Sequence, residues 1–205
     1  MNNTSSAKKI GILLFENACP MDFIGPYEAF SVVNYGATDN HYEIFTVSEK
    51  KGDINTFDLT VKAAYDFTNC PQADIVIIPG GNTPKLLDNV QIIEWIQKQK
   101  QQAAIVFSVC NGALLLAKAG LLKGLSATTH HKFYDALLEI DPTIHLNKQD
   151  RFVDNGNIIT AAGISAGIDA ALHIIYKTLG KEAYLKSCEI LEYGDAWKAM
   201  QSQKK

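Results

Sequence analysis

Short uninterrupted apolar runs, separated by amphipathic segments, constrain the fold of this chain more than any other feature. The runs lack the alternation of a half-exposed strand, which indicates strands that are covered on both faces. They span residues 9–15, 42–47, 73–81, 103–109 and 157–163, with a shorter run at 125–130. Such strands, alternating with helices, predict an α/β fold: a doubly wound, mostly parallel sheet flanked by helices.

The segments of helical period complete this prediction. They span residues 25–34, 85–99, 111–122, 164–179 and 181–192. Together with the strands they predict a flavodoxin-like sandwich. Residues 52–61 alternate weakly and predict a hairpin or an edge element. No repeat or linker divides the sequence, so we expect a single domain over 1–205, with frayed polar ends at 1–8 and 198–205.

Composition narrows the classes of function. The 205 residues carry a formal net charge of −3, which argues against a chain that binds nucleic acid or an anionic membrane as a whole. The polar N-terminus does not resemble a signal peptide, and no apolar run has the length of a spanning helix. The four cysteines lack CxxC spacing, and we expect free thiols in a cytoplasmic protein. No residue cluster has the spacing of metal ligands, so we expect no metal.

Residues that could take part in catalysis or ligand binding follow several of the predicted strands. Ligands of open α/β sheets bind beyond the carboxyl ends of the strands. Cys110 follows the run 103–109, the pair Gly80–Gly81 ends the run 73–81, and His130 ends the run 125–130. Asp22 comes several residues after the first strand. We therefore expect a thiol, a carboxyl group and an imidazole on one rim of the sheet.

Cys110 lies in the segment "SVCNG", between a predicted strand and a predicted helix. The small flanking residues resemble those of a nucleophile elbow, a tight turn that pushes a nucleophile out of the sheet. The helix after Cys110 would direct its positive end at the sulfur, which predicts a lowered thiol pKa and a reactive thiolate. The alternative is an inert, packed thiol.

Asp22 and His130 each have two interpretations. Asp22 is either a cap for a helix that starts near Gly25–Pro26 or a partly protonated carboxyl group beside the thiol; Glu16 and Glu28 are rivals for the second role. His130 and its neighbour His131 leave a strand on opposite sides, so at most one faces Cys110, as a base or an orienting partner; the alternative is a satisfied polar residue. The N–H groups of Gly80 and Gly81 could stabilise negative charge near the thiol or simply form a tight turn.

The order of four motifs resembles the ThiJ/PfpI superfamily, which shares the class I glutamine amidotransferase-like fold. These motifs are "IVIIPGG", "SVCNGALLLAKAGLL", "ATTHH" and "AAGISAGIDAALHI". The opening "GILLFENACPMDFIGPYEAF" is similar to the isonitrile hydratase-like branch. The resemblance covers about residues 9–195.

The resemblance implies a role for individual residues. Cys110 matches the elbow cysteine, Asp22 its companion carboxylate, His130 the histidine of the "TTH" motif, and Gly81 the glycine whose backbone faces the thiol. It also implies a homodimer. Asn111 and His131 depart from the threonine and tryptophan that are common at these positions, and both are expected near the pocket. Some members append a helix-turn-helix module, for which this chain has no room after its last predicted helix, so we expect no direct DNA binding.

The resemblance implies a lyase that hydrates an isonitrile to an N-substituted formamide. Cys110 would add to the isonitrile carbon while Asp22 moves the protons, with no metal or organic cofactor. One alternative is glyoxalase or deglycase chemistry on methylglyoxal, in which His130 shares the proton transfers. The other is a protein without turnover, in which Cys110 senses oxidation or the pocket only binds a small ligand.

Overall fold

A seven-stranded sheet forms the centre of the computed structural model, which describes residues 6–37 and 40–203. Its strand order is β10-β11-β7-β6-β1-β2-β5, and every neighbouring pair is parallel except β10 with β11. The strands are β1 (Lys8–Leu13), β2 (Tyr42–Ser48), β5 (Tyr65–Asp66), β6 (Ile75–Ile78), β7 (Ile105–Val109), β10 (Phe152–Asp154) and β11 (Ile158–Ala161). The predicted α/β fold with a mostly parallel sheet is confirmed.

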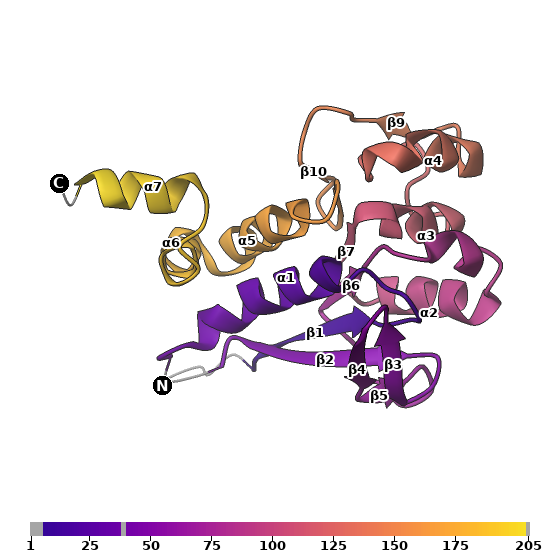
Figure 1. Ribbon diagram of the computed structural model, residues 1–205, viewed down its shortest axis with the longest axis horizontal. Helices are drawn as coiled ribbons and strands as arrows, with labels where there is room; N and C mark the ends of the chain where they lie inside the picture. The colour runs from indigo at the N-terminus through magenta and orange to yellow at the C-terminus, as the bar shows by residue number, and fades with distance from the viewer. Residues whose placement is uncertain (1–5, 38–39, 204–205) are drawn as a thin grey trace.

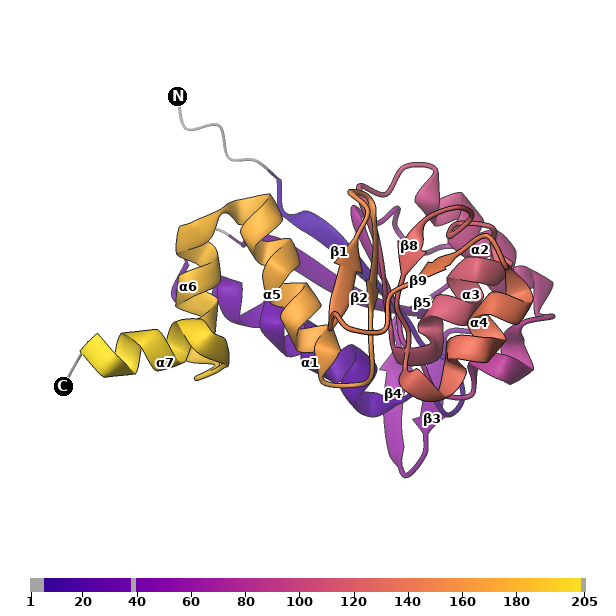
Figure 2. The same cartoon turned by 90° about the horizontal axis from the view of Figure 1, so that it is seen from above.

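Helices cover both faces of this sheet (Figure 1, Figure 2). One face carries α1 (Pro20–Ser31), α5 (Ala166–Leu179), α6 (Lys181–Ile190) and α7 (Gly194–Gln203). The other carries α2 (Val90–Lys100), α3 (Ala113–Lys118) and α4 (Tyr134–Ile140). Single 3₁₀ turns occur at η1 (Val32–Asn34), η2 (Thr83–Leu86), η3 (Cys110–Gly112) and η4 (His131–Phe133). None of the helices in the described part of the chain is long and apolar enough to cross a membrane.

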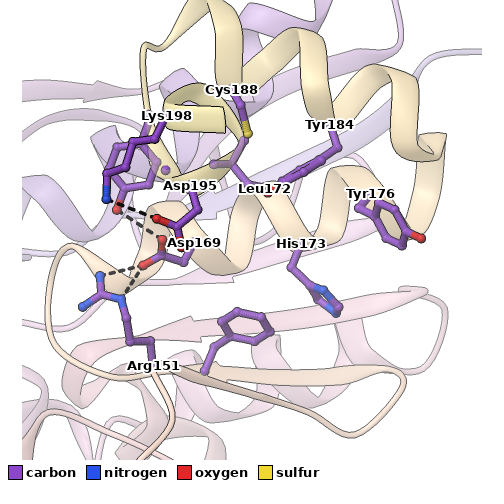
Figure 3. A pocket seen from close by; sticks show the side chains of 12 residues that line it. Arg151, Asp169, Leu172, His173, Tyr176, Tyr184, Cys188, Asp195 and Lys198 are labelled. Carbon is purple, nitrogen blue, oxygen red and sulfur yellow. Dashed lines mark hydrogen bonds and ion pairs between the residues drawn. The ribbon is translucent and has the colours of Figure 1, made fainter. Parts of the chain in front are cut away.

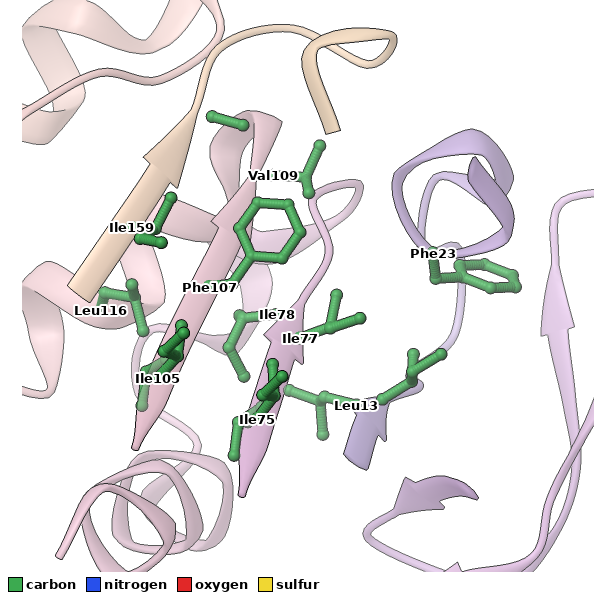
Figure 4. Packing of buried hydrophobic residues seen from close by; sticks show 14 of the residues in the cluster. Leu13, Phe23, Ile75, Ile77, Ile78, Ile105, Phe107, Val109, Leu116 and Ile159 are labelled. Atoms are coloured by element: carbon green, nitrogen blue, oxygen red, sulfur yellow. The ribbon is translucent and has the colours of Figure 1, made fainter. Parts of the chain in front are cut away.

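The central strands explain why their sequences are uninterrupted apolar runs. Every residue of β6, β7 and β11 is buried, because helices cover both faces. Side chains such as Ile77, Phe107 and Ile159 have no exposed surface, and they pack together between the layers (Figure 4). This core holds the carboxyl ends of β1, β6, β7 and β11 at one edge of the sheet.

Two small sheets lie outside the central one. The strands β3 (Gly52–Thr56) and β4 (Leu59–Ala63) form an antiparallel pair, one of the two arrangements predicted for residues 52–61. The short strands β8 (Ser126–Ala127) and β9 (His145–Leu146) pair with each other. The run 125–130 is therefore not a strand of the central sheet. Two of its residues instead bond to other segments: the Thr128 backbone N–H donates to Thr160 Oγ1 at 3.0 Å, and Thr129 Oγ1 donates to the Cys110 C=O.

Two element boundaries differ from the prediction. The helix expected from about residue 25 begins at Pro20, and Pro26 lies inside it. Proline suits the first turn because the N–H groups there have no acceptor within the helix, so the N–H that proline lacks costs no hydrogen bond. Asp22 thus occupies the first turn of α1. At the other end, the polar tail expected from residue 198 is helical as far as Gln203. Residues 1–5 and 204–205 lie outside the described residues.

Candidate active site

Cys110 occupies a strained turn directly after β7. Its φ is +57°, a left-handed conformation that costs free energy for any residue with a β-carbon and that clusters at functional sites. Its N–H donates to Ala162 O at 2.8 Å, and its C=O accepts from Thr129 Oγ1 at 2.8 Å. The backbone is thus fixed on both sides, and only 7 % of the residue is exposed. The sharp strand-to-helix turn expected from "SVCNG" is present.

Gly112 is required by the close approach of two strand ends. A β-carbon at Gly112 would lie 2.3 Å from Ile78 O, on the neighbouring strand β6. Any side chain here would push the turn after Cys110 away from β6. The glycine of the elbow segment is therefore explained by packing.

Asp22 lies next to this turn although it is far away in sequence. It is completely buried in the first turn of α1, and its Oδ2 accepts the Gly80 N–H at 2.9 Å. The thiols of Cys19 and Cys110 both interact with the carboxyl group. No described residue completes an ordinary hydrogen bond to the buried Oδ1 atom. The carboxyl group thus faces the elbow rather than capping its own helix.

Burial controls the protonation of this pair. It raises the pKa of Asp22 to about 6, against the opposing effects of the Gly80 N–H and the two thiols. Burial and then the negative charge of Asp22 raise the pKa of Cys110 to about 12, although the N–H groups of Asn111 and Ile164 favour the thiolate. The lowered thiol pKa that we expected is therefore wrong. Helix α3 is short, and its positive end does not outweigh desolvation and a nearby anion. The proton resides on sulfur, with a carboxyl group positioned to accept it.

The two glycines after β6 hold other residues in place. The Gly80 N–H is taken by Asp22, and the Gly81 N–H donates to Asn111 Oδ1 at 2.7 Å. Neither donor is free to stabilise a developing charge, which corrects that interpretation. Gly81 has φ of +125°, and a β-carbon there would lie 2.3 Å from Asn17 O. The glycine pair allows the loop before α1 to approach the sheet closely.

Asn111 joins the two turns. Its side chain accepts from the Gly81 N–H and donates through Nδ2 to Gly81 O at 2.9 Å, and only 1 % of the residue is exposed. Thr83 Oγ1 donates to the Asn111 C=O at 3.2 Å. Asn111, which stands where threonine is common, therefore holds the loop of Gly80 and Gly81 against the turn at Cys110.

His130 is not joined to the thiol. Its Nδ1 accepts the Lys132 N–H at 3.3 Å, and its ring stacks on exposed His131 with centroids 4.3 Å apart. Gly163 leaves room for the ring, since a β-carbon there would lie 2.8 Å from His130 Cδ2. Burial and the nearby charges of His131 and Lys132 lower the pKa of His130. Within the described residues, no interaction connects either histidine with Cys110 or Asp22.

Glu16 and Glu28, the other candidates for the carboxyl group beside the thiol, lie elsewhere. Glu16 and Glu28 are exposed, and their oxygens accept from Asn55 N–H and Tyr35 OH. From the sequence, we expect no role for Cys19 beyond that of a free thiol. In the structure Cys19 directly precedes α1, and its thiol interacts with Asp22. A spacing of three residues at a helix start was the available signal.

A further pocket is lined by a different set of residues (Figure 3). It has a volume of about 720 Å³ and is lined by residues of β10, α5, α6 and α7. Its Arg151 guanidinium pairs with Asp169 at 2.6 Å, and Tyr193 OH donates to the same carboxylate at 3.2 Å. None of the expected site residues lines it. In the described part of the chain, no three His, Cys, Asp or Glu side chains converge as metal ligands.

Comparison with known proteins places this arrangement in context. The sequence matches the DJ-1/PfpI family over residues 8–177. It is 35% identical to an isonitrile hydratase of Pseudomonas putida, over 93% of this chain and 80% of that protein. It is 27% identical to the transcriptional regulator GbdR of Pseudomonas aeruginosa over 91% of this chain, but spans only 51% of the regulator.

Two solved structures show the same fold. A ThiJ/PfpI family protein from Pseudomonas syringae superposes with a TM-score of 0.83 at 26% identity, covering 94% of this chain and 78% of the other. Drosophila melanogaster DJ-1beta superposes with a TM-score of 0.80 at 18% identity, covering 92% of this chain and 99% of the other.

Proposed function

Because this chain belongs to the DJ-1/PfpI family, we propose that it is a cysteine-dependent enzyme that adds water to an isonitrile and releases an N-substituted formamide. The similarity to an isonitrile hydratase over most of both chains supports this substrate class. The observation that carries the proposal is the position of Asp22. A buried carboxyl group that interacts with the thiol of a strained cysteine can move protons between the sulfur, the substrate and water.

The first half of the reaction starts from a thiol and a carboxylate. Asp22 accepts the proton of the Cys110 thiol as the sulfur adds to the terminal carbon of R–NC. Asp22 then delivers this proton to the same carbon. The product is a thioimidate, R–N=CH–S–Cys110, and Asp22 is a carboxylate again. Because the proton moves as the bond forms, a thiol with a raised pKa is compatible with nucleophilic attack.

The second half consumes water. Asp22 accepts a proton from water as the hydroxyl group adds to the thioimidate carbon, and the proton passes to the nitrogen. The carbon–sulfur bond then breaks, the sulfur recovers the hydroxyl proton, and R–NH–CHO leaves. A group with a pKa of about 6 is suited to accept and donate a proton near neutral pH. Neither half requires a metal or an organic cofactor.

Methylglyoxal chemistry has less support. That alternative assigns His130 a share of the proton transfers, but the ring of His130 is engaged with Lys132 and His131. No contact of His130 with Cys110 favours it.

We expect the enzyme to act as a homodimer in the cytoplasm, on a small molecule and without nucleic acid. The exposed apolar side chains of Met21, Ile24 and Tyr27 on α1 lie on the helix that carries Asp22, and a second copy would cover them. Light scattering coupled to gel filtration measures the mass in solution. A monomeric mass would remove the homodimer from the proposal.

The test of the reaction uses cyclohexyl isocyanide and the purified protein. We expect N-cyclohexylformamide to accumulate with wild-type protein and to be absent with Cys110→Ala. Equal product from both proteins would exclude the mechanism. Consumption of methylglyoxal without any formamide would favour the alternative reaction.

A further inference from the structure

Arg151 is the only arginine among the 19 lysine and arginine residues of the chain. It directly precedes β10, and its guanidinium lies beside Asp169 of α5 (Figure 3). Its Nε and Nη2 atoms both lie 2.6 Å from Asp169 Oδ2, and Nη2 also donates to Ser165 Oγ at 3.1 Å. The planar guanidinium holds two acceptors in a fixed geometry, which the single ammonium of a lysine does not do. Arg151 therefore fixes Ser165, the residue before α5, relative to the first turn of that helix.

The backbone of Arg151 holds the same segment at its other end. Its C=O accepts the Ala162 N–H at 2.9 Å, and the Ala162 C=O accepts the Cys110 N–H at 2.8 Å. Residues 162–165 are therefore attached to Arg151 at both ends. This segment also binds the backbone of the nucleophile.

Ile164, inside this segment, has a backbone conformation that needs support. Its φ is +41°, in the left-handed region that a β-branched residue rarely adopts. Such strain persists only where the surroundings fix the backbone. The Ile164 side chain is 42% exposed, so burial in the core does not hold it. Its N–H group interacts with Cys110 and favours the thiolate, so the strain serves the sulfur.

We propose that Arg151 is a positioning residue for Cys110. Its guanidinium holds the start of α5, and with it the Ile164 N–H, against the sulfur. As the thiol gives its proton to Asp22, this N–H stabilises the negative charge that develops on sulfur before the bond to the isonitrile carbon forms. The effect on catalysis rests on the proposed function, whereas the effect on the thiol does not.

A second charged contact between the same two elements provides a matched control. Lys177 of α5 bonds both oxygens of Asp154 on β10, at 3.0 and 2.9 Å. It joins α5 to β10 as Arg151 does, but near the end of the helix, away from residues 162–165. A contact that only stabilises the packing of α5 would serve equally well at either end.

The experiment measures the alkylation of Cys110 by iodoacetamide in the full-length protein. At a fixed pH of about 9, below the pKa of about 12 of this thiol, the rate is proportional to the fraction of thiolate. Trypsin releases Cys110 in residues 101–118 and Cys70 in residues 63–85, so mass spectrometry follows the two thiols separately. Cys70 lies outside the site and reports any general change in reactivity.

Four variants are compared with the wild-type protein. We expect Arg151→Gln and Ser165→Ala to lower the Cys110 rate by about 3- to 10-fold, because the Ile164 N–H is no longer held on the sulfur. Arg151→Lys keeps the charge without the planar fork and should behave like Arg151→Gln. Lys177→Gln removes an equal charge from α5 and should react like the wild-type protein. The Cys70 rate should be the same in all five proteins.

The kinetics of hydration provide the second readout. With cyclohexyl isocyanide, Arg151→Gln should lower kcat by about the same factor as the alkylation rate and leave KM within about twofold, because Arg151 acts through the segment and not on the substrate. Circular dichroism confirms that each variant is folded. Ser165→Ala, which removes one exposed hydroxyl group, tests the proposal even if Arg151→Gln does not fold.

Three results would overturn the proposal. A faster Cys110 alkylation in Arg151→Gln would show that the segment only shields the thiol. An equal decrease in Lys177→Gln would reduce the role of Arg151 to packing, and full rescue by Arg151→Lys would reduce it to charge. If the alkylation rates change as expected but no protein makes formamide, the proposed function alone is contradicted.

Discussion

The carboxyl group of Asp22 is completely buried and interacts with the thiol of Cys110, although 88 positions separate the two residues. The Gly80 N–H fixes one oxygen of this carboxyl group, and the φ of +57° at Cys110 fixes the thiol opposite it. Burial raises the pKa of both the Asp22 carboxyl group and the Cys110 thiol, so the pair keeps a proton that one group can pass to the other. The chemical behaviour of the site follows from the effect of each group on the protonation of the other.

Removing the charge of Asp22 should make the thiol easier to ionise while it stops catalysis. Asp22→Asn eliminates the anion that helps to raise the pKa of Cys110, so the pKa should fall below that of the wild-type protein. The loss of the proton carrier should lower kcat/KM for the isonitrile by about 10²–10⁴-fold. The rate of iodoacetamide alkylation against pH measures the first effect, and Glu28→Gln on the exposed face of α1 is the control. A thiol pKa that is unchanged in Asp22→Asn would contradict the contact.

The pH profile of hydration should report the ionisation of Asp22. The reaction starts from the carboxylate, and the pKa of Asp22 is raised to about 6. We expect kcat/KM to rise about tenfold per pH unit below pH 6 and to level off above it. Initial rates in overlapping buffers from about pH 4.5 to about pH 9 measure this dependence. An activity that is highest at the acid end of the range would assign the opposite protonation state to Asp22.

The same carboxyl group should reduce the stability of the folded protein above its pKa. The unfolded chain has an ordinary aspartate pKa near 3.8, and folding raises it to about 6. Below both values the proton is bound in either state and the effect is absent. As the pH rises between them, the folded protein loses stability, and above 6 the loss is complete, at about 3 kcal/mol.

Asp22→Asn is neutral throughout and should escape this loss. The difference in free energy of unfolding between Asp22→Asn and the wild-type protein should shift in favour of the variant on going from acid to neutral pH. Urea unfolding at two pH values on either side of the pKa measures it. Glu28→Gln should change the free energy by less than about 0.5 kcal/mol at both. A difference for Asp22→Asn that is constant with pH would argue against a buried, ionised carboxyl group.

Asn111 should contribute to stability through its two hydrogen bonds to Gly81. Asn111→Ala leaves the partly buried N–H and C=O of Gly81 without these partners, at a cost of about 1–3 kcal/mol. Asn69→Ala removes hydrogen bonds to Asp66 on the surface and should cost less than about 1 kcal/mol. Chemical unfolding of both variants compares the two sites. Equal costs would show that Asn111 does not fix the loop.

The strands of the central sheet could be predicted because burial on both faces leaves a direct signal in the sequence. The uninterrupted runs around Ile77 and Phe107 are strands with no exposed side chains. The run 125–130 gave a similar signal for another reason. Thr128 and Thr129 are buried in it: the backbone N–H of Thr128 donates to Thr160 Oγ1, and the Thr129 hydroxyl donates to the Cys110 C=O. Local pattern does not separate these two uses of β-branched residues.

The identity of the main site residues could be predicted from the sequence better than their protonation states. Cys110 and Asp22 were identified from the sequence, and the structure brings them together. The charge of the thiol was predicted wrongly, because the sequence shows the following helix but not the depth of burial or the position of Asp22. His130 was expected near the thiol from its place after a strand that is not part of the central sheet. Cys19 was not singled out, although its spacing of three residues from Asp22 at a helix start was a signal that the sequence offered.

The most direct test of the account is the product formed from an isonitrile by three matched proteins. Wild-type protein, Cys110→Ser and Asp22→Asn are each incubated with cyclohexyl isocyanide, and N-cyclohexylformamide is quantified by mass spectrometry. The account predicts formamide with the wild-type protein and at least about 100-fold less with either variant. Formamide from Asp22→Asn at the wild-type rate, with Cys110→Ser inactive, would contradict the claim that one carboxyl group moves the protons for this thiol.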